Sequence, residues 1–323
     1  MSSARSVVYA AFACERLSID KGQSVVVVVV VVTPPTSSFL SCSEHGAHVT
    51  NWTVGGRDVL FLSSKAVLDG SKAIRGGIPL CFPWFGPSTH PDSSLQHGFA
   101  RVSNWRCVDE QQDGRGLTME LKDSDVDPAL LAGYSDSKFV VRYSVKILDG
   151  SSLGLEMVVK NVGDVPLPFS LAFHSYFRVA AASVEVRLNA TGVRFLDQLS
   201  GSEGVNAGGV VEGFGDREID LVCYGVTNPI DIVTNEGEKR AKSKGTEGGA
   251  SANATTVVTI DASDGLRDAV VWNPHVAKSK AMADFGDEEY REMVCVESAR
   301  VETPVVVRAG GEWACSLRLR VFR

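Results

Sequence analysis

The chain has 323 residues, of which 44% are hydrophobic and 22% are charged, a composition typical of soluble globular proteins. Its formal net charge at pH 7 is −7 and no basic stripe stands out, which argues against nucleic acid and anionic membranes as partners. The length allows one large β domain or two ordinary domains.

An unbroken valine run lies near the N-terminus, at residues 25–32. Eight residues are too few to span a bilayer, and the β-branched valine side chain favours a strand over the core of a signal peptide. Residues 1–13 leave room for a short transit peptide, and we otherwise expect a cytoplasmic protein. The seven cysteines are scattered and include no C-x-x-C pair, which favours reduced thiols in that compartment.

Short apolar or alternating runs recur along the chain and are separated by Gly, Asp, Asn and Pro. The predicted strands lie at residues 25–32, 59–62, 139–148, 153–159, 184–188, 257–260, 269–272, 304–307 and 315–322. In the last run Cys315, Leu317 and Leu319 alternate with polar residues, which is the period of a half-buried strand. An Asp-Gly pair at 149–150 predicts a hairpin turn. Many short strands favour a large antiparallel sandwich.

Few helices and two loops are predicted. Short helices are expected near residues 128–132 and 288–292, and a loop is expected at residues 123–136. Residues 235–254 form a low-complexity stretch rich in Gly, Lys, Glu and Ser. We expect a flexible insertion there, because strand patterning resumes at Thr255.

Residues 74–106 combine Gly, Pro, aromatic, His and Arg side chains at high density, in IRGGIPLCFPWFG and QHGFARVSNWR. Arg75 precedes two glycines, and Arg101 follows Gln96 and His97 closely. Two arginines that converge on one pocket would suit a phosphate group. Four aromatic side chains could form the wall of a sugar site: Phe82, Trp84, Phe85 and Phe99. The same composition also fits a crossover with solvated arginines and core aromatics.

Two residues are candidates for proton transfer. His174 lies in FHSYF, and an unperturbed pKa of about 6.5 suits a proton donor and acceptor, although a histidine among aromatic rings is also typical of a core. Glu297 interrupts the apolar run MVCVESAR, where a buried carboxylate must be paired, exposed at a strand end or kept for proton transfer. His45 and His48 form H-x-x-H without a further ligand at metal-binding spacing, so we expect no metal site. No nucleotide or redox-cofactor motif is present.

Six motifs occur in order at compatible spacing: IRGGIPLCFPWFG, QHGFAR, FHSYF, REID, WNPH with KAMADFGDEEYREMVCVESA, and VETPVVVRAGGEW. From about His45 to Trp313 they resemble the glucose-6-phosphate 1-epimerase (hexose-6-phosphate mutarotase) family, a branch of the aldose 1-epimerases. The resemblance implies one all-β domain over residues 1–323, with its motifs within about 40–323. It also implies a galactose-mutarotase-like β-supersandwich of large antiparallel sheets and a reaction without metal or cofactor. We expect a monomer whose partner is a hexose 6-phosphate.

The family pattern also implies the roles of individual residues. The general acid corresponds to His174 and the general base to Glu297. The substrate-binding residues correspond to five side chains: Arg75, Gln96, His97, Arg101 and Asp220. Trp84 and His275 depart from the family pattern, and either substitution could reshape a pocket wall and change which hexose phosphate is preferred.

Anomer exchange fits these residues chemically. It requires a proton to leave the anomeric hydroxyl while the ring oxygen is protonated, so an acid and a base on opposite sides of the sugar ring suffice. Two other functions stay open. The first is an aldose 1-epimerase of free hexoses, although a free hexose carries no phosphate dianion to balance the charges of Arg75 and Arg101. The second is a non-catalytic carbohydrate-binding protein with the same fold.

Overall fold

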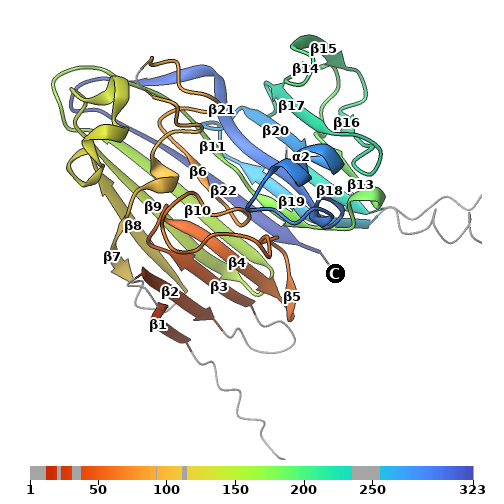
Figure 1. The fold of residues 1–323 in the computed structure, drawn as a ribbon, viewed down its shortest axis with the longest axis horizontal. Coiled ribbons are helices and arrows are strands. Elements are labelled where there is room, and N and C mark those ends of the chain that lie inside the picture. The colour runs from red at the N-terminus through yellow and green to blue at the C-terminus, as the bar shows by residue number, and fades with distance from the viewer. Residues whose placement is uncertain are drawn as a thin grey trace, which may run out of the picture.

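The structure is a computed structural model that describes residues 12–19, 23–30, 38–91, 93–110, 115–227, 229–234 and 255–322. Antiparallel strands arranged in three sheets make up most of this part of the chain (Figure 1), so the predicted all-β fold class is confirmed. The predicted insertion at 235–254 lies outside the described residues, as do residues 1–11 of the N-terminal segment.

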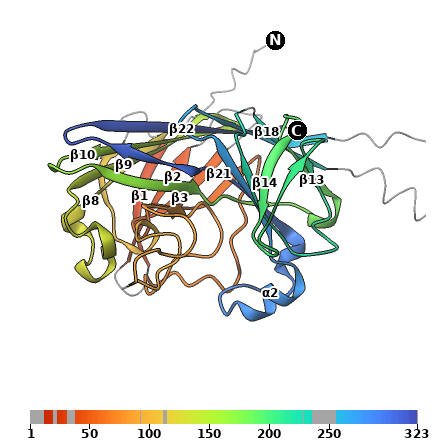
Figure 2. The same ribbon diagram turned by 90° about the horizontal axis from the view of Figure 1, so that it is seen from above.

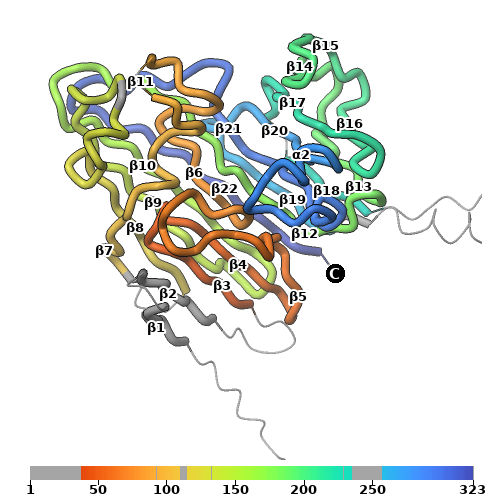
Figure 3. Tube along the Cα trace, viewed as in Figure 1, coloured from red at the N-terminus to blue at the C-terminus, as the bar shows by residue number. Residues whose placement is uncertain are grey.

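The first sheet follows the chain order. Its five strands are β1 (Phe12–Ile19), β2 (Gln23–Val30), β3 (Ser38–Ser43), β4 (His48–Val54) and β5 (Arg57–Asp58). The valine run therefore forms a strand, as predicted, up to the last described residue of β2. Figure 3 shows β3, β4 and β5 of this sheet on the side of the molecule away from β14 and β15.

The second sheet has nine strands, and the C-terminal strand lies at its centre. In spatial order they are β16 (Val210–Val211), β13 (Val184–Arg187), β18 (Ile230–Thr234), β19 (Thr255–Ala262), β22 (Glu312–Val321), β10 (Ser152–Asn161), β9 (Phe139–Asp149), β8 (Gly116–Lys122) and β7 (Arg106–Glu110). The period-two prediction for β22 is confirmed, because Cys315, Leu317 and Leu319 are all buried. The Asp-Gly turn joins β9 to β10 as predicted.

The third sheet has eight strands. In spatial order they are β15 (Ser202–Asn206), β14 (Val193–Asp197), β17 (Ile219–Tyr224), β20 (Asp268–Asn273), β21 (Met293–Val307), β11 (Leu167–Phe173) and β6 (Leu80–Cys81), while β12 (Tyr176–Arg178) also pairs with β21. The consecutive strands β21 and β22 belong to different large sheets, which ties the two sheets together (Figure 2).

The helices among the described residues are short. One α-helix, α2, spans His275–Ala281. The 3-10 turns are η1 (Ala100–Val102), η2 (Asp123–Asp125), η3 (Pro128–Leu130), η4 (Ala132–Tyr134), η5 (Ala181–Ser183) and η6 (Glu289–Glu292). The two predicted short helices are confirmed as η3 and η6. No helix in the described ranges has the length and apolarity needed to cross a bilayer.

Three local predictions differ from the structure. Residues 59–62 form only isolated bridges, through Leu60 and Leu62, because the chain there turns away from β4 toward two other segments. The predicted loop at 123–136 contains three 3-10 turns. Helix α2 was not predicted, since seven residues give too little helical periodicity to detect.

The two faces of the eight-stranded sheet have different surroundings. Side chains of successive strand residues point to opposite faces. On β21, Val294 and Val296 belong to the main hydrophobic core, whereas Cys295 packs in a separate cluster with Trp272 of β20. Glu297 follows Cys295 by two residues and therefore shares its face. This second face carries the candidate site.

Candidate active site

A pocket of about 260 Å³ lies over the second face of the eight-stranded sheet. Its lining residues come from five loops, three strands and helix α2: Arg75, Phe85, Gly86, Pro87, Gln96, His97, His174, Gln198, Asp220, Val270, Trp272, Lys278, Met282 and Glu297. Six of the seven predicted site residues are among them. Arg101 is the exception.

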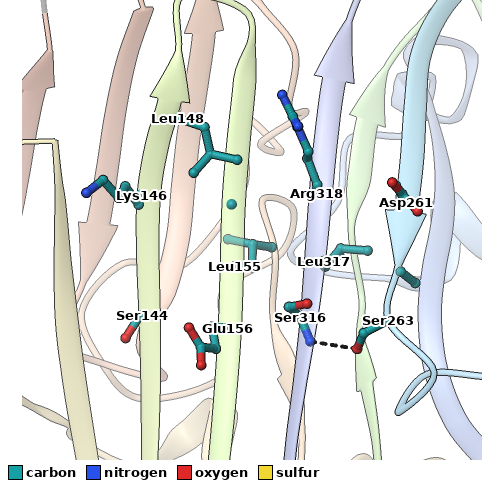
Figure 4. A pocket seen from close by; sticks show the side chains of 12 residues that line it. Ser144, Lys146, Leu148, Leu155, Glu156, Asp261, Ser263, Ser316, Leu317 and Arg318 are labelled. Atoms are coloured by element: carbon teal, nitrogen blue, oxygen red, sulfur yellow. Dashed lines mark hydrogen bonds between the residues drawn. The ribbon is translucent and has the colours of Figure 1, made fainter.

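A larger pocket of about 470 Å³ lies elsewhere, across β9, β10, β22 and the end of β19 (Figure 4). Its side chains project from neighbouring strands of the nine-stranded sheet, and the amide of Ser316 donates to Oγ of Ser263 at 2.9 Å. Its ionisable side chains, such as Glu156 and Asp261, are exposed or half-buried. Because none of them is buried, this pocket is the weaker candidate for acid–base chemistry.

His174 lies where the strand pairing is interrupted. Strand β11 pairs with β21 up to Phe173, and pairing resumes at Tyr176 of β12, so His174 and Ser175 bridge the gap. The amide of His174 donates to the carbonyl of Pro79 at 2.9 Å, and the His174 ring stacks on Tyr176 at 4.8 Å between centroids. The break therefore turns the imidazole out of the sheet and into the pocket.

Glu297 occupies the centre of the sheet beside this break. Its oxygen Oε1 lies 3.1 Å from Nδ1 of His174, and the whole Glu297 residue is only 1% exposed. The approach is not aligned as a hydrogen bond: within the described part of the chain, Nδ1 of His174 and Oε2 of Glu297 are buried atoms without a hydrogen-bond partner. Leaving buried polar atoms without hydrogen bonds costs free energy, and a protein that does so often uses those atoms in function.

Burial controls the protonation of this pair. It raises the pKa of Glu297 well above the usual value, and the Asp220 carboxylate adds to that shift. Burial also lowers the pKa of His174 well below the usual value, helped by His97 and the nearby arginines. The pair therefore favours one proton in total and titrates as a unit. One group can then accept a proton while the other donates one.

His97 is held in a strained backbone conformation beside the pair. Its φ is 63°, in the left-handed region that few residues other than glycine adopt. The amide of Gly86 donates to Nδ1 of His97 at 3.1 Å, so Nε2 carries the proton when the ring is neutral. Burial, helped by Arg101 and Arg75, lowers the pKa of His97 to about 3. His97 is therefore a neutral hydrogen-bond donor in the pocket.

Arg75 reaches the pocket from a loop that two glycines allow to pack closely. A Cβ on Gly77, whose φ is 62°, would lie 2.1 Å from the carbonyl oxygen of Val49. The Arg75 guanidinium donates through Nη1 to the hydroxyl of Tyr176 at 3.2 Å and through Nε to Asp284 at 3.4 Å. Within the described residues its Nη2 has no hydrogen bond, which leaves one donor edge for a ligand.

Asp220 lines the pocket from strand β17. It accepts a 2.6 Å hydrogen bond from Nε2 of Gln198, and burial raises its pKa. Lys278 of α2 also lines the pocket, and its Nζ lies 4.0 Å from Glu218. Neither Gln198 nor Lys278 was predicted from the sequence. Gln198 lies in the segment FLDQL at residues 195–199, which is not among the six motifs, and its adjacent polar residues Asp197 and Gln198 are the signal that could have pointed to it.

Arg101 lies beside the pocket and does not line it. Its Nη2 donates to the carbonyl of Gln96 at 2.8 Å, and its Nε is buried without a hydrogen-bond partner among the described residues. Burial lowers the Arg101 pKa, while the negative form of Glu297 opposes that shift. A direct contact between Arg101 and substrate therefore stays a prediction. Beside the larger effects of burial, the positive charge of Arg101 acts to lower the pKa of both His174 and Glu297.

Several predicted wall residues lie elsewhere. Of the four aromatic candidates only Phe85 lines the pocket. Phe82 and Phe99 are in the main core, and Trp84 packs against that core while donating to the carbonyl of Leu95. His275 packs against Tyr290 and is not a lining residue either. Trp84 and His275 therefore do not line this pocket, and their contacts are with core residues.

The H-x-x-H pair has a structural role. Nε2 of His48 lies 2.8 Å from the carbonyl of Gly76, and His45 contacts the carbonyl of Lys72 at 3.0 Å. Both histidines hold the loop that presents Arg75. Among the described residues, the three metal-ligand types that do converge are His174, Cys295 and Glu297.

Comparisons with known proteins identify the family of this chain. A family model for aldose 1-epimerase matches residues 29–320. A "Putative glucose-6-phosphate 1-epimerase" of Cenchrus ciliaris is 38% identical over 84% of this chain and 79% of its own length, and a protein of the same name from Escherichia coli is 30% identical over 79% and 77%. A crystal structure of a "putative mutarotase" from Salmonella typhimurium superposes with a TM-score of 0.75 at 25% identity, covering 98% of this chain and 97% of that one. The chain belongs to the aldose 1-epimerase family.

Proposed function

We propose that this chain interconverts the α and β anomers of glucose 6-phosphate by general acid–base catalysis. The observation that carries the proposal is the 3.1 Å approach of His174 to Glu297 in a pocket that also contains Arg75 and Asp220. The names of the relatives from Cenchrus ciliaris and Escherichia coli support the choice of substrate. The whole chain would act as one monomeric catalytic unit.

The single proton of the His174–Glu297 pair is sufficient for the reaction. With the proton on His174, the Glu297 carboxylate takes the proton of the anomeric hydroxyl, and His174 delivers its proton to the ring oxygen. The bond between C1 and the ring oxygen breaks, its electron pair goes to that oxygen, and C1 becomes an aldehyde. After rotation about the C1–C2 bond the same transfers reverse, and the ring closes on the other face.

The two groups lie side by side, not on opposite sides of the ring as expected from the sequence. Adjacent placement suits the chemistry, because the anomeric hydroxyl and the ring oxygen are both attached to C1. A base and an acid in contact can therefore reach both oxygens at once. Burial also favours proton uptake by Glu297, since a raised pKa makes its ionised form, present when the shared proton lies on His174, a stronger base.

The other lining residues suit the rest of the sugar phosphate. His97 offers an N–H donor, and Asp220 with Gln198 offers a hydrogen-bonded acceptor for hydroxyl groups. The open edge of Arg75 suits a phosphate oxygen, with the charge of Arg101 nearby. A free hexose would leave this positive charge unbalanced. Buried cysteine thiols without disulfides, at Cys81, Cys223, Cys295 and Cys315, support a reducing cytoplasmic location.

The direct test is to measure anomer exchange of glucose 6-phosphate by NMR, alongside free glucose and free galactose. We expect acceleration above the uncatalysed rate for the phosphorylated sugar and little acceleration for the free sugars. The doubly altered variant His174→Asn/Glu297→Gln serves as the control for buffer and phosphate catalysis. Equal acceleration of all three sugars would favour an aldose 1-epimerase of free hexoses, and binding without exchange would favour a carbohydrate-binding protein.

A further inference from the structure

We propose that Zn²⁺ binds between His174, Cys295 and Glu297 and reversibly blocks the active site. The proposed metal binding depends only on the geometry of these three side chains and not on the proposed function. The block of catalysis rests on the proposed function, because it requires that His174 and Glu297 transfer protons.

The three side chains converge for reasons of strand geometry. Cys295 and Glu297 are two residues apart on β21, so both point to the second face of the sheet. The break between β11 and β12 brings His174 beside them, with Tyr176 paired directly to Cys295. One ligand atom from each of His174, Cys295 and Glu297 lies within 4.8 Å of the other two.

The three side chains are buried, and some of their polar atoms have no hydrogen-bond partner in the part of the chain that is described. Cys295 is fully buried and His174 is 7% exposed. Nδ1 of His174 and Oε2 of Glu297 lack hydrogen-bond partners among the described residues, so a cation would satisfy polar atoms that the protein leaves unpaired. The pocket is lined by His174 and Glu297 but not by Cys295, so it offers a metal an entry path, and a fourth position for water, on the side of the first two residues.

The donor set suits Zn²⁺. One thiolate, one imidazole and one carboxylate are ligands that Zn²⁺ accepts, and three protein ligands with an open position are typical of accessible zinc sites. Ligand atoms of a tetrahedral zinc site are separated by roughly 3.3–3.6 Å, as follows from its bond lengths. Side-chain movements of about 1 Å would therefore close the present cluster around the metal. Mg²⁺ prefers oxygen ligands and should not bind.

Zinc and the sugar would compete for the same atoms. A metal bound to Glu297 and His174 displaces the proton that the pair exchanges, because ligands must be deprotonated. It also occupies the position of C1 and its two oxygens. Inhibition should therefore be competitive with glucose 6-phosphate and should be reversed by a chelator.

Metal binding is tested without any activity assay. Co²⁺ added to the intact protein should give the absorption band of a cobalt–thiolate bond, and Zn²⁺ titration by calorimetry should show one site per chain. Cys295→Ala should abolish the band and weaken Zn²⁺ at least about 10–100-fold, since loss of an outer-shell partner alone costs that much. Cys81→Ala is the matched control, because Cys81 is an equally buried thiol on β6 outside the cluster. An unchanged cobalt band in Cys295→Ala would overturn the site.

Inhibition is tested separately. Zn²⁺ should inhibit anomer exchange in the unaltered protein and in Cys81→Ala. Inhibition is measured relative to the metal-free rate of each variant, and half inhibition of Cys295→Ala should require at least about 10-fold more Zn²⁺. Equal sensitivity of the two cysteine variants would overturn the proposed block. If the protein bound cobalt through Cys295 but showed no anomer exchange, the metal site would stand and the proposed function would fail.

Discussion

Glu297 is a carboxylate placed inside an otherwise apolar sheet, next to Val296 and opposite Val270 on β20. Taking an ionised carboxylate out of water is costly, and the cost falls when the group holds a proton or shares one with a neighbour. His174 provides that neighbour at 3.1 Å. The same burial that would destabilise an isolated glutamate therefore prepares a pair that passes one proton back and forth.

The pair should behave as a unit when it is altered. His174→Asn and Glu297→Gln keep the shape of each side chain, so each should lower kcat by about 10² or more with little change in substrate binding. The double variant should be hardly slower than the worse single variant, because either change alone stops the transfer. NMR exchange rates, with melting temperatures as a check on folding, measure this. Full activity in either single variant would mean that the role is misassigned.

At the scale of elements, the site depends on interruptions in regular structure. The break after β11 frees His174, and the left-handed residues in the 74–77 and 96–98 loops present Arg75 and His97. Asn273, fully buried at the end of β20, donates to the carbonyls of Tyr290 and Met293 and thereby holds the chain around α2. These irregular segments place side chains that a continuous strand would direct into the core or the solvent.

Alanine substitutions at two glycines with similar φ can distinguish the cost of backbone strain from the cost of a steric clash. Gly56 has φ 74° with open space around a Cβ, whereas a Cβ on Gly77 would meet backbone at 2.1 Å. Gly56→Ala should cost about 1–2 kcal/mol through the left-handed conformation alone. Gly77→Ala should cost roughly 1–3 kcal/mol more, because backbone must move. Urea denaturation measures both, and equal costs would show that the loop carrying Arg75 gives way freely.

Features encoded by a few neighbouring residues could be predicted from the sequence, whereas features that depend on tertiary contacts could not. Alternation over β22 and the turn before β10 are local patterns, and both predictions are confirmed. Residues 59–62 are apolar enough for a strand, but tertiary contacts decide their pairing. Gln198 and Lys278 reach the pocket only because β14 and α2 pack near β17, which no local pattern shows. His174 and Glu297, 123 positions apart in the chain, were paired only through the family resemblance.

At the scale of the whole molecule, an acidic protein places three cationic side chains at one pocket, beside the carboxyl groups of Asp220 and Glu297. The net charge is −7, yet Arg75 and Lys278 line the pocket and Arg101 lies against it. They come from three distant segments, so only the folded chain assembles them. A dianionic substrate would therefore be attracted by local charge while the rest of the surface repels it.

The selection of phosphorylated over free sugar should depend on this assembled charge. The phosphate is remote from C1 and carries the same charge in the ground and transition states, so its contacts are largely uniform binding and their loss raises KM. Arg75→Gln and Arg101→Gln should each lower kcat/KM for glucose 6-phosphate roughly 10- to 150-fold, as expected for a charge-assisted bond of about 1.5–3 kcal/mol. Any exchange of free glucose should hardly change. Arg291→Gln, an exposed arginine paired with Glu288, is the matched control. Equal losses on both sugars would show that the two arginines support the scaffold or the ring site, and would restore the free-hexose function to first place.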